Sequence, residues 1–275
     1  MPLRRGYSQR PDQFRLNYGH PLAQGLVFAG LGGPAGVAST LYRDSSLYCN
    51  HGTLTNMDPA TDWVWDQFLG RWVLDFDGSN DGVDCGAATS FDCTDGVSVA
   101  FWMKITSKLV ERNLVYKGKN YVLGESWTSQ YQTDDTLVFG IEQDRCMPHT
   151  KNLVGTWHHV TGTFNNQLSA VQIKNYVDGA VYGLATRAAA IPVTTRSVCI
   201  GGGYDGSYPM LGRIGDPLIY NRALSTSEIS ILADPSNTML GGLLMPPKRR
   251  YYRIGAASAS HGHPTMDTIP TMGTI

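Results

Sequence analysis

Residues 155–164 read Gly-Thr-Trp-His-His-Val-Thr-Gly-Thr-Phe, and residues 171–179 read Val-Gln-Ile-Lys-Asn-Tyr-Val-Asp-Gly. In both segments large apolar side chains recur at every second or fourth position, which places them on one face of an extended strand. The residues that share this face are Val160 and Phe164 in the first segment, and Val171, Ile173 and Val177 in the second. Asp178-Gly179 is typical of a tight hairpin turn. The stretch therefore predicts two strands of an antiparallel sandwich.

The rest of the chain repeats this pattern, with turn signals every 8–12 residues. Alternating segments predict further strands at residues 71–77, 82–85, 96–105, 112–117, 120–125, 136–143, 180–185, 196–201 and 209–220. Residues 56–70 are interpreted as a long ordered loop, and residues 125–132 as a loop rich in aromatic and amide side chains. Ser225 with Glu228 three residues later predicts a capping box that opens one short helix.

Four motifs occur in the order seen in a known family. They are Trp-His-His-Val with Tyr-Val-Asp-Gly in the hairpin, Leu74–Gly78 with Asp81–Val83, Ile200–Gly203, and Gly212–Ser225 with Glu228-Ile229. Together they resemble the laminin-G-like, concanavalin-A-like jelly rolls over about residues 25–235. The resemblance implies an all-β fold, a two-sheet antiparallel jelly-roll sandwich with one short helix. Residues 1–24 and 236–275 lie outside the resemblance, and their composition and lack of periodicity predict an N-terminal arm and a C-terminal arm.

Composition narrows the classes of partner. The formal net charge is -1, which argues against nucleic acid as the main partner. No apolar run reaches the roughly 18 residues that a membrane helix needs, and no apolar core follows the basic N-terminus as in a signal peptide. The five cysteines include no Cys-x-x-Cys pair, so a zinc site is not expected.

The resemblance requires a search for a glycosidase site, because retaining enzymes of this fold carry Glu-x-Asp-x-x-Glu on one strand. The nearest match is Glu142-Gln143-Asp144-Arg145-Cys146-Met147. Its last position is Met147, which cannot donate a proton. The sequence therefore predicts that the protein is not an enzyme, and a glycoside hydrolase with a displaced acid stays the weakest hypothesis.

The resemblance also implies a calcium site, because similar jelly rolls bind Ca²⁺ between the early Asp-Ser turn and the closing strand. The matching positions are Asp44 and Asp216. Two carboxylates with backbone carbonyls and water could form such a site. The alternative is that Asp44 caps its own turn through an Asx hydrogen bond and that Asp216 pairs with an arginine.

A carbohydrate site would need aromatic and amide side chains at a sandwich edge or concave face. The candidates are Trp127, Tyr131, Gln132, Tyr204 and Tyr208. The alternative is that these tyrosines are ordinary surface or interface residues.

The C-terminal arm contains a basic, aromatic segment. Its candidate partner-binding residues are Arg249, Arg250, Tyr251, Tyr252 and Arg253, since Tyr and Arg anchor interfaces. The arm is either disordered or orders on a neighbouring subunit.

These observations favour a non-enzymatic structural protein. The segment Asn17–Phe28 resembles the leader of jelly rolls found among phage virion genes. That resemblance implies a capsid-decoration or tail-associated protein of the virion, docked through its arms onto other virion proteins and onto itself, with trimers common among such proteins. The alternative is a carbohydrate-binding module that recognises a surface glycan.

Overall fold

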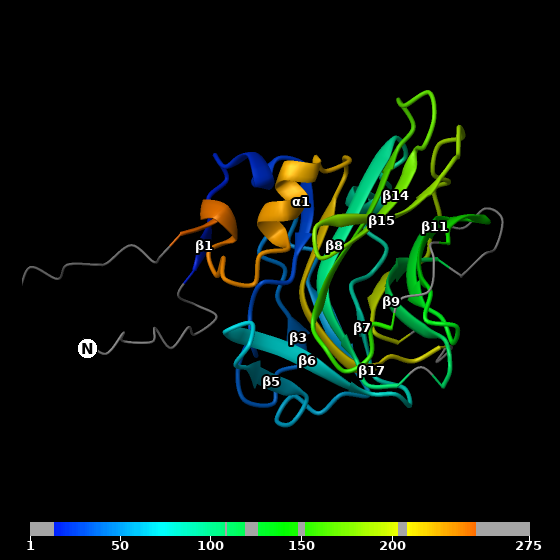
Figure 1. Ribbon diagram of the computed structural model, residues 1–275. Helices are drawn as coiled ribbons and strands as arrows, with labels where there is room; N and C mark the ends of the chain where they lie inside the picture. Colours follow the sequence, from blue (N-terminus) through cyan, green and yellow to red (C-terminus); the bar gives the residue numbers. More distant parts are fainter. Residues whose placement is uncertain (1–13, 108, 119–125, 148–151, 203–207, 246–275) are drawn as a thin grey trace, which may run out of the picture.

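The computed structural model describes residues 14–107, 109–118, 126–147, 152–202 and 208–245 (Figure 1). Within them the chain forms two antiparallel sheets of eight strands each. Sheet I runs in the order β15 (Ala180–Ala185), β14 (Ile173–Val177), β13 (His158–Asn165), β8 (Gly96–Ile105), β17 (Leu211–Tyr220), β6 (Arg71–Asp77) and β5 (Trp63–Asp66), with β2 (Leu26–Ala29) also on β17. Sheet II runs in the order β12 (Asp144–Cys146), β11 (Leu137–Ile141), β10 (Trp127–Tyr131), β9 (Arg112–Lys117), β16 (Val198–Ile200), β7 (Gly82–Asp84), β4 (Gly52–Thr55) and β3 (Leu41–Tyr42).

The inner faces of the two sheets form the main core. The hairpin predicted at residues 155–179 is confirmed as β13 and β14, in which Val160 pairs with Val177 and Phe164 with Ile173. All four side chains are buried in the main core. Gly162 lies between them because a Cβ at this position would come within 2.1 Å of the Phe139 ring of sheet II. The all-β sandwich predicted from the sequence is confirmed.

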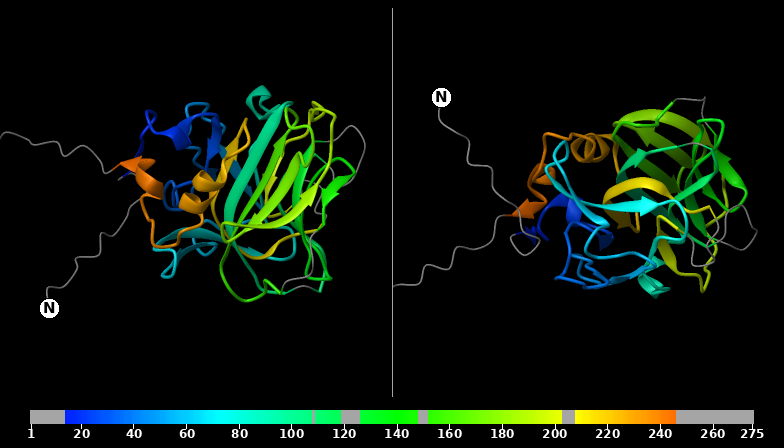
Figure 2. Two further views of the ribbon diagram at one scale, coloured as in Figure 1. Left: turned by 45° about the horizontal axis from the view of Figure 1, so that its top comes forward. Right: turned by 90° about the horizontal axis from the view of Figure 1, so that it is seen from below.

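A second core covers the outer face of sheet I. It is built from the ends of the described chain: β1 (Arg15–Leu16), the 3-10 helices η2 (Pro21–Ala23) and η4 (Leu240–Gly242), the helix α1 (Thr226–Leu232) and β18 (Leu244–Met245). Their apolar side chains pack on Ala100, Tyr176, Leu218 and Tyr220 of the sheet. Figures 1 and 2 show these blue and orange elements side by side on one side of the sandwich.

The predicted boundaries of both arms are therefore wrong. Leu16, Leu22, Leu240, Leu243 and Leu244 are buried in the second core, and Arg15 and Leu16 pair with Met245 and Leu244. The sequence did not predict the burial of these leucines, because they lie in short segments without helical or strand periodicity. Only residues 1–13 and 246–275 of the predicted arms lie outside the described residues.

Several predictions about single elements can be compared with the structure. The helix and its capping box are confirmed, since the Ser225 side chain accepts from Glu228 N and Glu228 reaches back to Ser225 N. The interpretation of residues 56–70 and 125–132 as loops was wrong, because they contain β5 and β10. The strand expected at residues 120–125 lies outside the described residues. No helix in the described part of the chain is long and apolar enough to cross a membrane.

Two buried ionisable groups have pKa values far from their ordinary range. Burial lowers the pKa of His159 to about 3, and its ring meets Trp102 edge-on at 5.2 Å between centroids. Burial, with added repulsion from Asp77 and Asp62, raises the pKa of Asp81 to about 6. The two groups act in opposite directions on stability in acid. Below pH 6.5 His159 is protonated in the unfolded chain but stays neutral in the folded chain, so acid lowers the free energy of unfolding through this residue. Between pH 6 and 3.8 Asp81 is protonated in the folded chain but ionised in the unfolded chain, so acid raises the free energy of unfolding through this residue.

Truncation should separate the true tails from the fold. A chain ending at Met245 should keep the melting temperature of the full-length protein. A chain ending at Pro235 should lose its cooperative unfolding transition, because it lacks three buried leucines that each contribute roughly 1.5–3 kcal/mol. Thermal denaturation followed by circular dichroism measures both, and equal melting temperatures for the two truncations would contradict the second core.

Acid stability should respond oppositely to two substitutions. Between pH 7 and 5, His159 costs the folded wild type about 2 kcal/mol, so His159→Leu should reduce the fall in melting temperature over this range. Asp81→Asn should enlarge that fall, because it removes the group that favours the folded state in acid. Melting curves of the wild type and both variants at the two pH values test the assignment, and a change of the same sign in both variants would contradict it.

Candidate functional site

The β5–β6 hairpin presents aromatic rings at the surface. Trp65 and Trp72 face each other across the hairpin, with ring centroids 5.7 Å apart and planes at 80°. Trp65 is 36% exposed, Phe68 in the turn is 60% exposed, and Trp72 is half-buried. Large exposed aromatic side chains are uncommon on a soluble domain, so their grouping marks this end of sheet I as a candidate interaction surface.

Asp66 holds the turn of this hairpin. Its Oδ1 accepts from the backbone N–H groups of Phe68 at 2.9 Å and Leu69 at 3.1 Å, and its Oδ2 accepts from Trp157 Nε1 at 3.0 Å. Gly70 closes the turn at a φ of 66°, a conformation that glycine adopts without strain. The hairpin is thus tied to the start of β13 and has a defined shape.

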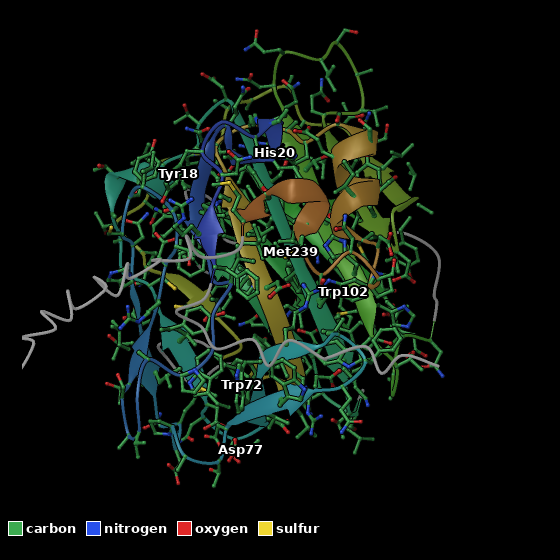
Figure 3. The ribbon with its side chains drawn as sticks, turned by 90° about the vertical axis from the view of Figure 1, so that its left-hand side faces the viewer. Tyr18, His20, Trp72, Asp77, Trp102 and Met239 are labelled. Carbon is green, nitrogen blue, oxygen red and sulfur yellow. The ribbon has the colours of Figure 1, made fainter. Side chains whose placement is uncertain are left out.

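Trp72 is held by close backbone packing. A Cβ at Gly33 would come within 2.5 Å of Trp72 Cδ1, so the ring lies directly on the backbone of the residue 30–33 segment. Figure 3 shows Trp72 on the face of the molecule that also carries Met239. The ring position therefore depends on a glycine that the fold places opposite it.

A small hollow opens between the hairpin and the ends of the described chain. We call it the aromatic hollow; six of the residues that line it are Phe14, Trp65, Arg71, Trp72, Asp216 and Leu244. Its volume of about 30 Å³ is room for roughly one water molecule. A sugar ring cannot enter it and would have to lie across its mouth, against the exposed ring of Trp65.

The polar wall of the hollow is an ion pair between Arg71 and Asp216. Asp216 sits in a β-bulge of β17 with a φ of 47°, a strained conformation for a residue with a side chain. Burial lowers the pKa of Arg71 to about 10, so the guanidinium stays charged at neutral pH. Its Nη2 is buried and has no hydrogen-bond partner among the described residues. A buried donor without a protein partner is uncommon, and this one belongs to the wall of the hollow, beside a carboxylate in a strained conformation.

The carbohydrate candidates chosen from the sequence do not form one site. Trp127 and Tyr131 are almost fully buried in the main core because they lie on the inner face of β10, so the prediction that they contact a ligand is wrong. Gln132 is nearly buried at the end of the same strand. Tyr208 is 45% exposed beside β9, where its carbonyl accepts from Asn113 N, and Tyr204 lies outside the described residues.

Sequence reasoning missed Trp65, Arg71 and Trp72. The available signal was two tryptophans flanking a six-residue turn segment that begins with aspartate and ends in glycine and arginine. The contribution of Asp216 to this hollow had no such signal, because it comes from a strand about 145 residues further along the chain.

The two carboxylates proposed for calcium are occupied by protein donors. Asp44 accepts from the N–H groups of Ala29, Ser46 and Asn50 and from the Ser46 hydroxyl, all within 2.8 Å, and Asp216 pairs with Arg71. These are the Asx turn and the arginine pair of the alternative interpretation. As arranged, the side chains do not fit a calcium ion, which needs several free oxygens. Within the described ranges no group of three or more His, Cys, Asp or Glu side chains could hold a metal ion, and the calcium site stays a prediction of the resemblance.

The near-match to a glycosidase motif is arranged as an ion-pair network. Arg187 donates to Glu142 Oε2 and Asp144 Oδ2, both at 2.6 Å. Met147, at the position of the missing acid, is exposed. The candidate partner-binding residues Arg249, Arg250, Tyr251, Tyr252 and Arg253 lie outside the described residues.

The fold is similar to that of several solved structures. Solved structures that resemble it include the sialidase of Trypanosoma rangeli in complex with sialic acid, at 17% identity and a TM-score of 0.57 over 78% of this chain and 33% of that one. Domain 4 of AbnA, a GH43 extracellular arabinanase from Geobacillus stearothermophilus, in complex with arabinotriose, matches at 17% identity and 0.56, over 76% of this chain and 98% of that one. The receptor binding domain of botulinum neurotoxin C/D mosaic serotype matches at 16% identity and 0.56, over 76% of this chain and 51% of that one.

At these identities the likeness shows the fold alone, and this chain spans only a third of the sialidase it matches. A search of curated proteins finds no match. The family described as the concanavalin A-like lectin/glucanases superfamily (Laminin_G_3) matches residues 77–230. Because this match covers more than half of the 275 residues, the chain belongs to the concanavalin A-like lectin/glucanases superfamily.

Proposed function

We propose that this protein is a non-catalytic carbohydrate-binding domain and that a saccharide binds at the β5–β6 hairpin. The observation that carries the proposal is the exposed ring of Trp65, fixed edge-to-face against Trp72 at the mouth of the aromatic hollow. The C–H face of a sugar ring is apolar and packs on an aromatic ring, while its hydroxyls need donors and acceptors at the edge.

Charged side chains around the rings supply those partners. Arg71 and Asp216 form the wall of the aromatic hollow, and Arg213 donates to Asp75 at 3.0 Å on the neighbouring strands. Charge-assisted hydrogen bonds to such groups are stronger than those between neutral partners. One aromatic platform with a few fixed polar groups is the general form of a small-ligand site.

The relatives support the class of ligand. Domain 4 of AbnA is solved with arabinotriose, the sialidase with sialic acid, and the neurotoxin fragment is a receptor binding domain. This chain matches 98% of the AbnA domain that is solved with a sugar, but only 33% of the sialidase. None of them identifies the sugar that this chain binds.

The acidic groups of the sandwich support the absence of catalysis. A retaining glycosidase needs one carboxylate free to attack and one acid able to donate a proton. Glu142 and Asp144 are both held by Arg187, and Met147 stands where the acid would be. A glycoside hydrolase is therefore the weaker hypothesis.

The virion hypothesis of the sequence analysis remains a separate proposal. It receives support from one observation, the pairing of Arg15 with Met245, because this pairing makes both terminal segments leave the domain at the same place. Docking on other virion proteins and assembly into a homo-oligomer are predictions that follow from it. A carbohydrate-binding surface on the hairpin is compatible with that role.

Trp65→Ala should abolish the stacking surface and weaken binding to the preferred glycan by at least about tenfold. The matched control is Tyr208→Ala, which removes another exposed aromatic ring, beside β9 and not on the hairpin, and should leave affinity unchanged. A printed glycan array identifies the ligand for the wild type, and calorimetric titration then measures the three affinities.

Both variants should keep a cooperative unfolding transition, since both residues lie at the surface. Loss of binding in Tyr208→Ala with full binding in Trp65→Ala would move the site to the β16–β17 loop. No binding of any glycan by the wild type would overturn the proposed function.

A further inference from the structure

A second hollow opens on the outer face of sheet I, where β8 and β17 separate it from the β5–β6 hairpin. Its floor is formed by β13 and β14, and its rim by the loop between these strands and by the residues that lead into α1. We call it the polar hollow; six of the residues that line it are Thr163, Asn165, Leu168, Lys174, Tyr176 and Leu224. It shares no lining residue with the aromatic hollow.

The polar hollow is large enough for a small molecule. Its volume is about 260 Å³, whereas that of the aromatic hollow is about 30 Å³. Binding sites for drug-sized ligands range over roughly 300–1,000 Å³. A volume just below that range suits a ligand of one sugar unit better than an oligosaccharide or a peptide.

Three side chains of the polar hollow carry hydrogen-bonding groups that the protein itself does not use. Thr163 and Lys174 face each other across β13 and β14, and within the described part of the chain neither side chain makes a hydrogen bond or an ion pair. Asn165 accepts from Gln167 N at 3.0 Å through its Oδ1, which leaves its Nδ2 free to donate. A hydroxyl, an ammonium and an amide are therefore available to a ligand in the same space.

The charge in the polar hollow is positive. Lys174 is the one charged side chain among the residues that line it. Glu228 accepts from the hydroxyl of Ser225 at the rim, but Arg222 holds this carboxylate in an ion pair at 2.6 Å. No unpaired carboxylate of the described lining therefore opposes a negative ligand, and a charge-assisted hydrogen bond to the ammonium would be stronger than one between neutral groups.

The remaining lining matches the other parts of a sugar. Leu168 is 39% exposed at the rim and offers a small apolar contact of the kind that the C–H groups of a sugar ring make. The ring of Tyr176 packs in the second core. Burial raises the pKa of Tyr176, so its hydroxyl stays protonated at neutral pH and can donate.

We propose that the polar hollow binds a single sugar unit that carries one acidic group, a carboxylate or a phosphate. The ammonium of Lys174 pairs with the acidic group, while Thr163 and Asn165 form hydrogen bonds to the sugar hydroxyls. The site is separate from the β5–β6 hairpin, so it does not depend on the proposed function.

The test is calorimetric titration of the full-length protein with glucuronic acid, a hexose phosphate, glucose and inorganic phosphate. At least one of the two acidic sugars should bind at least about tenfold more tightly than glucose and than inorganic phosphate. Lys174→Gln should remove this preference. The matched control is Lys104→Gln, which changes another half-buried lysine of sheet I outside the polar hollow and should keep the preference.

The possible failures are distinguishable. Equal affinity for acidic sugars and glucose, or a preference that Lys174→Gln leaves intact, would overturn the acidic-sugar site. Equal affinity for the hexose phosphate and inorganic phosphate would reduce the polar hollow to an anion site and contradict the roles of Thr163 and Asn165. Acidic-sugar binding that Trp65→Ala abolishes and Lys174→Gln does not would assign that ligand to the hairpin. Failure of the proposed function would instead appear as unchanged glycan binding in Trp65→Ala.

Discussion

The structure depends on the burial of sheet I on both faces. Its central strands β8 and β17 carry apolar side chains in both directions, so water must be excluded from each side. Sheet II covers the inner face. Among the described residues, the outer face is covered by α1, the two terminal stretches around residues 14–24 and 236–245 with their two-stranded sheet β1–β18, and the turn of the β5–β6 hairpin.

The elements that cover the outer face of sheet I also position the candidate site. The β5–β6 turn and the terminal ribbon both pack on the outer face of sheet I, and the aromatic hollow lies between them. Trp72 packs against Gly33 at the border of the main core, and its partner Trp65 is exposed. The buried Arg71–Asp216 pair links the hairpin to β17 across this boundary. Removing one member would leave an uncompensated buried charge, so the pair supports the shape of the site as well as its chemistry.

The sequence predicted the sandwich well because period-two alternation and turn residues are local signals. Val160 and Phe164 alternate with polar neighbours, and Asp178-Gly179 closes the hairpin as expected. The second core escaped prediction because its leucines are scattered over short segments, and Leu16 meets Leu244 only through tertiary contact. The binding site was also not predicted, because its residues come together only through tertiary contact.

The aromatic candidates for the carbohydrate site were chosen by residue type, without knowledge of which face of the strand each side chain lies on. Trp127 and Tyr131 have the composition of a sugar site, yet their positions on β10 point them inward. Which face of a strand is buried depends on the register with its neighbours, and a single sequence does not contain that register. To predict a site at Trp65 and Trp72, one would need to know that β5 is the edge strand of sheet I. One would also need to know that residues 30–33 pack beside the hairpin.

The six tryptophans allow the central claim to be tested in one spectrum. Each indole N–H gives a separate resonance, and Trp127 on β10 is buried in the main core away from the hairpin. Titration with the glycan selected on the array should shift the indole resonances of Trp65 and Trp72 and leave that of Trp127 in place. Shifts confined to other tryptophans, or none at saturating ligand, would contradict a carbohydrate site on the β5–β6 hairpin.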